Sequence, residues 1–176
     1  TGPMSMDDWH GAAWLSGGTQ LRVKFDVAAE NVARAQVYVA APGCHALFVN
    51  GAIPLPDLRG VCPWVAGASR TQHIDYAHDR TNVRYMTHDL HALVTPGRNA
   101  LGIIAGNQSG RWSNSPQVIV LVVAKFANER SPTFVLSSSS DEWMGRDPYV
   151  TTSTAWDATI DWTRQEQGWS EPGFKT

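Results

Sequence analysis

The sequence predicts an all-β protein, an antiparallel β-sandwich of jelly-roll type with little helix. Three observations point to this fold class. Short segments rich in Val, Ile, Phe and Tyr recur along the chain, about eight to ten of them in all. Turn residues separate these segments, among them 15 glycines and 10 prolines. No segment keeps a helical period, and no repeat recurs at a fixed spacing. Many short strands between turns are typical of sandwiches and barrels.

The clearest strand is residues 20–27, QLRVKFDV, which alternate apolar and polar side chains as a half-buried strand does. Residues 7–15 precede it, and we expect an irregular lead-in that packs on an end of the domain. Residues 35–51 predict two more strands joined by a tight turn at Pro42-Gly43, which is a hairpin near the centre of the fold. Asn50-Gly51 is a strong turn signal at the end of that hairpin.

The second half of the chain predicts a further set of strands. Residues 82–88 alternate in polarity, and residues 89–94 predict one helical turn with Asp89 near its start. The continuous apolar run at 118–126 suits a central strand covered on both sides, and residues 133–137 return as its partner. Further short strands are expected at 71–75, 100–105 and 149–154, and the tail at 155–174 has no helical period.

Composition and charge restrict the classes of function. The 176 residues suffice for one domain with a sizeable core, and 43% apolar with 17% charged residues is a globular composition. A net charge of −2 with scattered Lys and Arg predicts no nucleic-acid partner. The longest apolar run, 118–124, is far shorter than the roughly 20 residues of a membrane span, so no membrane partner is expected. We interpret residues 1–6 as an expression scar or tail and residues 7–176 as a single domain.

Signatures of catalysis are absent from the sequence. It contains no G-x-S-x-G, P-loop, H-E-x-x-H or C-x-x-C motif. A glycosidase needs two carboxylates that face each other across a sugar. The acidic pairs of this chain lie among turn residues, where a solvated face or a cap is the usual role. They are Asp7/Asp8, Asp141/Glu142 and Asp157/Asp161. The two cysteines, Cys44 and Cys62, are compatible with one disulfide or with two reduced thiols.

Tryptophan is the unusual component of the composition, with eight residues. One reading is that tryptophans close the ends of a sandwich core, and the other is that some form flat surface platforms for a sugar ring. Trp64 and Trp112 stand in two long, turn-rich segments, residues 52–70 and 106–116. Long loops in a compact domain often carry function, so these two tryptophans are the candidate platforms.

A polar cluster at residues 73–82 is the candidate metal site. Asp75, Asp79 and Asn82 offer the hard oxygen ligands that Ca²⁺ takes in groups of six to eight. The spacing is not that of an EF-hand. Histidines in the same segment suit zinc better, although zinc needs a tighter geometry. The alternative is a solvated loop whose aspartates cap turns, and the residues alone favour that alternative.

Four stretches in a fixed order carry a family resemblance. Residues 35–51 contain AQVYV and LFVNG, residues 82–102 contain NVRYMTHDL and PGRNALG, residues 106–112 contain GN followed by Trp112, and residues 155–174 contain AWDA and GWSEPGF. Together they resemble the N-terminal β-sandwich domain of bacterial-type α-L-rhamnosidases, over nearly the whole chain. The chain departs from the family pattern in a longer segment at 58–76 and in His88, where the family has tyrosine.

The resemblance implies a galactose-binding-like jelly roll without catalytic residues. In the family, the catalytic acid and base of this inverting glycoside hydrolase lie in a separate helical barrel that this chain does not contain. Some members bind L-rhamnose and calcium through such a domain, whereas in others it braces the barrel. The sugar-binding residues would be Trp64, Trp112 and Asn107, and calcium would be held by Asp75, Asp79 and Asn82.

Three hypotheses of function follow. The first is a carbohydrate-binding accessory domain, with a rhamnose-containing glycan and the catalytic domain of the same parent chain as partners. The second is a structural domain that braces a catalytic barrel or mediates protein–protein contact. The third, an independent small enzyme, has the least support, because none of the acidic pairs argues for catalysis.

Overall fold

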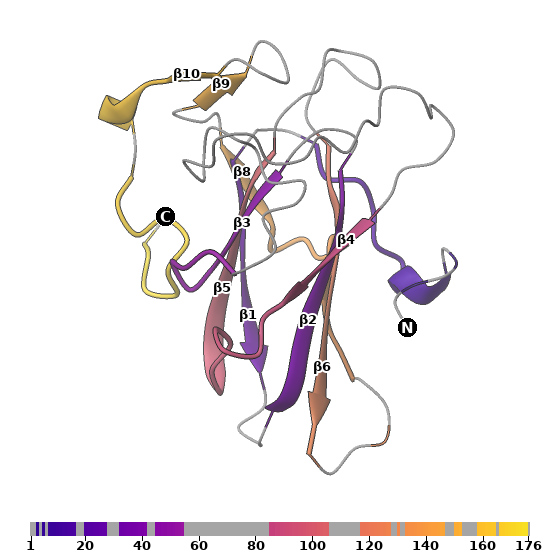
Figure 1. Ribbon diagram of the computed structural model, residues 1–176. Helices are drawn as coiled ribbons and strands as arrows, with labels where there is room; N and C mark the ends of the chain where they lie inside the picture. The colour runs from indigo at the N-terminus through magenta and orange to yellow at the C-terminus, as the bar shows by residue number, and fades with distance from the viewer. Residues whose placement is uncertain are drawn as a thin grey trace.

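The computed structural model describes residues 3, 5, 7–16, 20–27, 32–41, 45–54, 85–105, 117–127, 130, 133–146, 150–152, 158–164 and 166–175 (Figure 1). Ten strands and two short 3₁₀ turns lie within this part of the chain. In order they are η1 (Asp7–Trp9), β1 (Gln20–Val27), β2 (Val32–Ala40), β3 (His45–Val49), β4 (Tyr85–Asp89), β5 (Gly97–Ala105), β6 (Ile119–Phe126), β7 (Thr133–Ser137), β8 (Met144–Arg146), β9 (Val150–Thr152), β10 (Ala158–Ile160) and η2 (Trp162–Arg164). Among these residues, no helix is long and apolar enough to span a membrane.

Eight of the strands form two four-stranded sheets that face each other. The first sheet has the order β3-β5-β1-β8 and the second the order β4-β2-β6-β7, while β9 and β10 pair separately. Every pairing is antiparallel. The β-sandwich that the sequence predicts is therefore confirmed.

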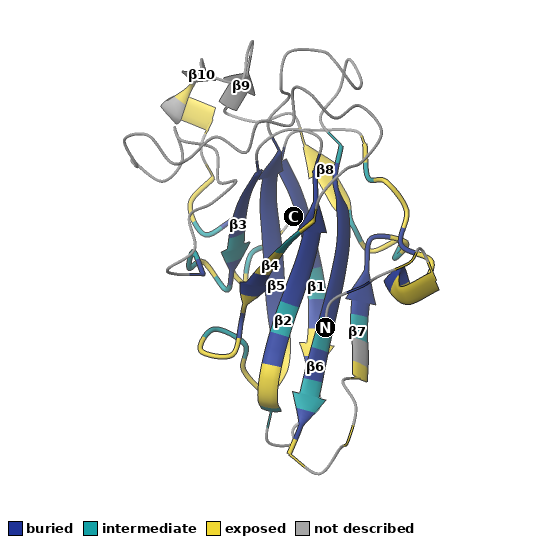
Figure 2. Ribbon diagram, turned by 45° about the vertical axis from the view of Figure 1, so that its right-hand side comes forward, coloured by how far each residue is buried: buried dark blue, intermediate teal, exposed yellow. Residues whose placement is uncertain are grey.

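The alternation of side chains explains how the two sheets share one core. The inward positions of β1 are Leu21, Val23, Phe25 and Val27, all of them buried, whereas the outward positions are polar. The central strands are buried along most of their length (Figure 2). Burial of each such aliphatic or aromatic side chain contributes about 1.5–3 kcal/mol.

The predicted hairpin at 35–51 is wrong in its pairing. Strands β2 and β3 both form, but β2 pairs with β4 and β6 in the second sheet, whereas β3 pairs with β5 in the first. The chain therefore crosses from one sheet to the other between these strands. A turn signal shows where the chain reverses, and it does not determine which strand edges will be free to pair.

Most strands predicted for the second half of the chain are confirmed. β6 lies between β2 and β7, so the central position predicted for residues 118–126 and the pairing with 133–137 are confirmed. Residues 90–94 form a single turn, in which the backbone N–H of Val94 donates to the carbonyl of Leu90, and Asp89 caps it by accepting from the N–H of His91. Strand β8 was not predicted, and the strand predicted at 71–75 lies outside the described residues.

The terminal segments cover the outer faces of the two sheets. Trp9 is buried against Tyr38 and Leu121 on the second sheet, and the backbone of Leu15 pairs with that of Val118. The lead-in therefore packs on a face of the sandwich and not on its end as predicted. The C-terminal tail, residues 166–175, runs along the first sheet, on the opposite side of the molecule from the N-terminus (Figure 1). β6 is thus covered on both sides, as its continuous apolar sequence requires.

Candidate functional site

The six residues predicted to bind sugar or metal lie outside the described residues. They are Trp64, Asn107 and Trp112 for the sugar and Asp75, Asp79 and Asn82 for the metal. Cys44 and Cys62 lie outside them as well. Among the residues that the structure does describe, no three His, Cys, Asp or Glu side chains are grouped so that they could hold a metal ion.

In two of the three acidic pairs, one carboxylate acts as a cap. Asp161 accepts hydrogen bonds from the N–H of Thr163 at 3.1 Å and from its hydroxyl at 2.6 Å, and these bonds lower the pKa of the carboxyl group. Asp8 accepts from the N–H and the hydroxyl of Ser5. This is the capping role that the sequence predicts for them.

The outward face of the first sheet carries a polar pocket of about 240 Å³. We call it the outer-face pocket. Its walls come from three elements: β1 and β5, which are neighbours in the sheet, and β8 with the turn before it. The lining residues are Lys24, Asp26, Arg98, Glu142 and Met144.

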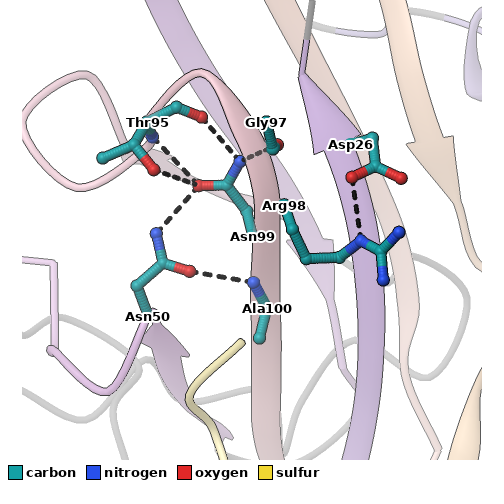
Figure 3. Close-up of polar contacts among 7 residues, drawn as sticks. All are labelled: Asp26, Asn50, Thr95, Gly97, Arg98, Asn99 and Ala100. Carbon is teal, nitrogen blue, oxygen red and sulfur yellow. Dashed lines mark hydrogen bonds and ion pairs between the residues drawn. The ribbon is translucent and has the colours of Figure 1, made fainter. Parts of the chain in front are cut away.

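An exposed ion pair spans the two strands at this pocket. The Nε of Arg98 donates to Oδ1 of Asp26 at 2.9 Å, across the register that places these two residues opposite each other (Figure 3). The hydrogen bond to Asp26 and the charges of Asp26 and Glu142 raise the pKa of Arg98. The pocket thus has two cations and two carboxylates in its lining, which suits a ligand that both donates and accepts hydrogen bonds.

The C-terminal tail closes the same face next to this pocket. Trp169 is buried, its ring packs edge-on against Phe48 at 5.4 Å between centroids, and a Cβ on Gly102 would lie only 2.7 Å from two of its ring carbons. Arg22 fastens the tail through its Nε, which donates to the carbonyl of Trp169 at 2.6 Å, and its Nη2, which donates to the carbonyl of Glu171 at 2.8 Å. Arg22 points outward from β1 yet is only 5% exposed, because the tail covers it.

A network of two asparagines joins the end of β3 to the first residues of β5 (Figure 3). The side-chain amide of Asn50 donates to Oδ1 of Asn99 at 2.8 Å, and Oδ1 of Asn50 accepts from the N–H of Ala100 at 2.8 Å. Asn99 also donates to the carbonyls of Thr95 and Gly97. Asn99 is fully buried, so these bonds satisfy a side chain that water cannot reach.

A pair of buried histidines connects the two sheets at their edge. His45 on β3 and His88 on β4 point inward, and their Nε2 atoms lie 3.1 Å apart. One ring therefore donates to the other. Burial, together with the neighbouring His88, lowers the pKa of His45 to about 3, so His45 is neutral near pH 7.

Several residues of the family resemblance have a structural role in these contacts. Asn50, Asn99 and Trp169 belong to the quoted motifs, and all three form contacts that close the fold. The outer-face pocket is lined by one residue of these motifs, Arg98 of PGRNALG, and otherwise by residues outside them. Lys24 and Asp26 were recognisable as polar positions of a half-buried strand, but nothing local indicated that Arg98 would face them.

The comparisons with known proteins point in one direction. No protein-family model matches the chain. An α-L-rhamnosidase of Streptomyces avermitilis is 27% identical over an alignment 183 residues long. The alignment covers 94% of this chain and 16% of that protein. The chain thus spans only about a sixth of the length of this curated relative.

Solved structures show the same fold. An α-L-rhamnosidase from Dictyoglumus thermophilum matches 99% of this chain and 21% of its own, with a TM-score of 0.77 and 22% identity. The S. avermitilis enzyme, solved in complex with L-rhamnose, matches 91% of this chain and 15% of its own, with a TM-score of 0.69 and 24% identity. The α-L-rhamnosidase from Aspergillus terreus matches 97% of this chain and 21% of its own, with a TM-score of 0.69 and 20% identity. The resemblance to a β-sandwich domain of α-L-rhamnosidases is confirmed.

Proposed function

We propose that this chain is a non-catalytic accessory domain of an α-L-rhamnosidase-like glycoside hydrolase, and that it binds a rhamnose-containing glycan. One observation carries the proposal: 94% of the chain is similar to a segment that makes up only 16% of an α-L-rhamnosidase. A match of this kind suits one domain of a larger enzyme, whose catalytic residues lie elsewhere in the parent chain.

The outer-face pocket supports the sugar-binding part of the proposal. Sugar hydroxyls both donate and accept hydrogen bonds, and the pocket offers donors on Lys24 and Arg98 and acceptors on Asp26 and Glu142. Its volume of about 240 Å³ lies below the range of drug-sized sites, so it suits a small ligand such as a single sugar ring.

The proposal keeps a second location for the sugar. There the ring would stack on Trp64 or Trp112 with help from Asn107, and a Ca²⁺ held by Asp75, Asp79 and Asn82 would contact its hydroxyls. The two locations differ in one measurable respect, because only the second requires calcium.

A calorimetric titration with L-rhamnose tests the proposal. We expect heat of binding, and we would repeat the titration with calcium and with a chelator. Binding that survives the chelator and is lost in Asp26→Asn places the sugar in the outer-face pocket, whereas binding lost with the chelator and in Asp75→Asn places it in the loops. A folded protein that gives no heat with L-rhamnose or with a panel of oligosaccharides would refute sugar binding.

A second candidate function, bracing of the catalytic domain, is favoured by a specific observation. Three residues of the family motifs, Asn50, Asn99 and Trp169, are engaged in closing the fold. Such motifs would be retained by a domain whose task is to be rigid. This function predicts no heat in the titration and a lower Tm for the catalytic domain of the parent chain when this domain is deleted. An unchanged Tm would exclude it.

A further inference from the structure

A small pocket lies where the C-terminal tail meets the first sheet. We call it the arginine pocket, and its volume is about 20 Å³. It adjoins the outer-face pocket, since Met144 lines both. The other lining residues are Gln20, Arg22, Arg146, Glu166, Trp169 and Phe174.

Arg22 is the unusual member of this pocket. It is only 5% exposed, and two of its three nitrogens are engaged by tail carbonyls. The third, Nη1, is buried and has no hydrogen-bond partner among the residues that the structure describes. Leaving a buried donor unpaired destabilises the folded protein, and more so when the donor is charged. A ligand oxygen at Nη1 would remove this destabilisation.

The charges around Arg22 indicate which oxygen it needs. The pocket has two guanidinium groups and one carboxylate, and that carboxylate, on Glu166, is already paired with Arg146. Burial and the nearby charge of Arg146 lower the pKa of Arg22, which is the effect of a positive charge without a counter-ion. A buried cation gains most from an anionic partner, and arginine binds carboxylates with charge-assisted hydrogen bonds.

The size and the walls of the pocket restrict the rest of the ligand. A volume of about 20 Å³ holds about one water-sized group. Of a ligand that carries a carboxylate, only one carboxylate oxygen therefore fits inside the pocket. The body of the ligand must remain at the mouth. There the half-buried ring of Phe174, whose centroid lies 5.5 Å from the Cζ of Arg22 and 5.9 Å from the Cζ of Arg146, offers an apolar contact. Met144, 37% exposed, is a flexible side chain that can move aside.

We propose that the arginine pocket binds the carboxylate of an acidic sugar, a uronic acid, with the sugar ring lying against Phe174 and Met144. The choice of a sugar as the carrier of the carboxylate rests on the proposed carbohydrate-binding function, whereas the anion site does not. L-rhamnose has no carboxylate, so its titration tests the proposed function separately.

Calorimetry with three probes at pH 7 tests the inference. D-glucuronate should bind, D-glucose, which lacks the carboxylate, should not, and acetate should bind more weakly than D-glucuronate. Equal binding of D-glucose and D-glucuronate would overturn the carboxylate assignment. Silence with both D-glucuronate and acetate would overturn the site, and it would mean that a buried water satisfies Arg22. Binding of acetate without D-glucuronate would overturn the sugar assignment.

Variants locate the binding. Arg146→Gln removes an exposed guanidinium at the pocket and should weaken D-glucuronate binding about tenfold or more. The matched control is Arg34→Gln, an exposed arginine of β2 in the other sheet, which should bind as the parent does. Arg22→Gln should abolish binding, but Arg22 also fastens the tail, so Arg146→Gln is the decisive variant. D-glucuronate binding that is unchanged in Arg146→Gln would overturn the inference.

Discussion

Gly102 of β5 lies directly under the indole ring of Trp169, and a Cβ at this position would come within 2.7 Å of the ring carbons Cη2 and Cζ3. It would also lie 2.9 Å from the Cβ of Ser170. Both neighbours belong to the tail, whose backbone is fastened to the sheet by Arg22. The tail can therefore reach its position only because residue 102 has no side chain.

Gly102→Ala should destabilise the protein by about 1–3 kcal/mol, because the methyl group forces Trp169 off the sheet. Urea denaturation followed by tryptophan fluorescence measures this loss. Gly173→Ala is the control within the same tail, since a Cβ at Gly173 meets no atom within 4 Å, and its stability should be unchanged. Combining Gly102→Ala with Trp169→Leu should cost less than the two single changes added together. Strict additivity would contradict this account of the contact.

Asn99→Ala should cost about 2–4 kcal/mol of unfolding free energy, because it removes a fully buried side chain with several hydrogen bonds. The partners left behind include the N–H of Thr95 and the side-chain amide of Asn50. Chemical denaturation of the single variants and of the Asn50→Ala/Asn99→Ala double variant gives the coupling between the two asparagines.

The coupling should be about 0.5–3 kcal/mol, with the double variant more stable than the sum of the single losses predicts. Thr87→Ala on the exposed face of β4 is the control and should lie within about 0.5 kcal/mol of the parent. If the losses from Asn50→Ala and Asn99→Ala simply add, the two side chains act independently and the network does not join the strand ends.

Local patterns predicted these strands well because the polarity of successive side chains shows which faces of a strand are buried. Residues 20–27 were predicted as a strand and form β1 with the same boundaries, and the apolar run at 118–126 became the central strand β6. In both cases the burial of one or both faces follows from the sequence of the strand itself. The helical turn capped by Asp89 was also predictable from local sequence, because a cap acts over only two or three residues.

What the sequence did not reveal depends on contacts between distant residues. The hairpin failed because β2 finds its partners in β4 and β6, far along the chain. Asp26 and Arg98 are 72 positions apart and meet only through the register of β1 with β5. Arg22 resembles any other outward polar residue of a strand until the tail covers it. The predicted sugar and calcium residues remain predictions.

The histidine pair predicts a pH dependence of stability. In the unfolded chain His45 takes up a proton near pH 6.5, whereas in the folded protein burial and His88 hold its pKa at about 3. Between these values the unfolded state binds more protons, so stability falls as the pH is lowered, by up to about 1.4 kcal/mol for each pH unit. The stabilisation is fully present above pH 6.5, and about 2 kcal/mol of it should be lost by pH 5.

Urea denaturation between pH 7.5 and pH 5 measures this dependence. His45→Leu replaces the titrating ring with an apolar side chain of similar size, so the variant should be less sensitive to pH even if it is less stable at pH 7.5. His91→Gln changes an exposed histidine on the turn after β4 and should keep the pH dependence of the parent. If His45→Leu loses stability with acid as steeply as the parent does, protonation of the buried His45 is not the origin of the acid sensitivity.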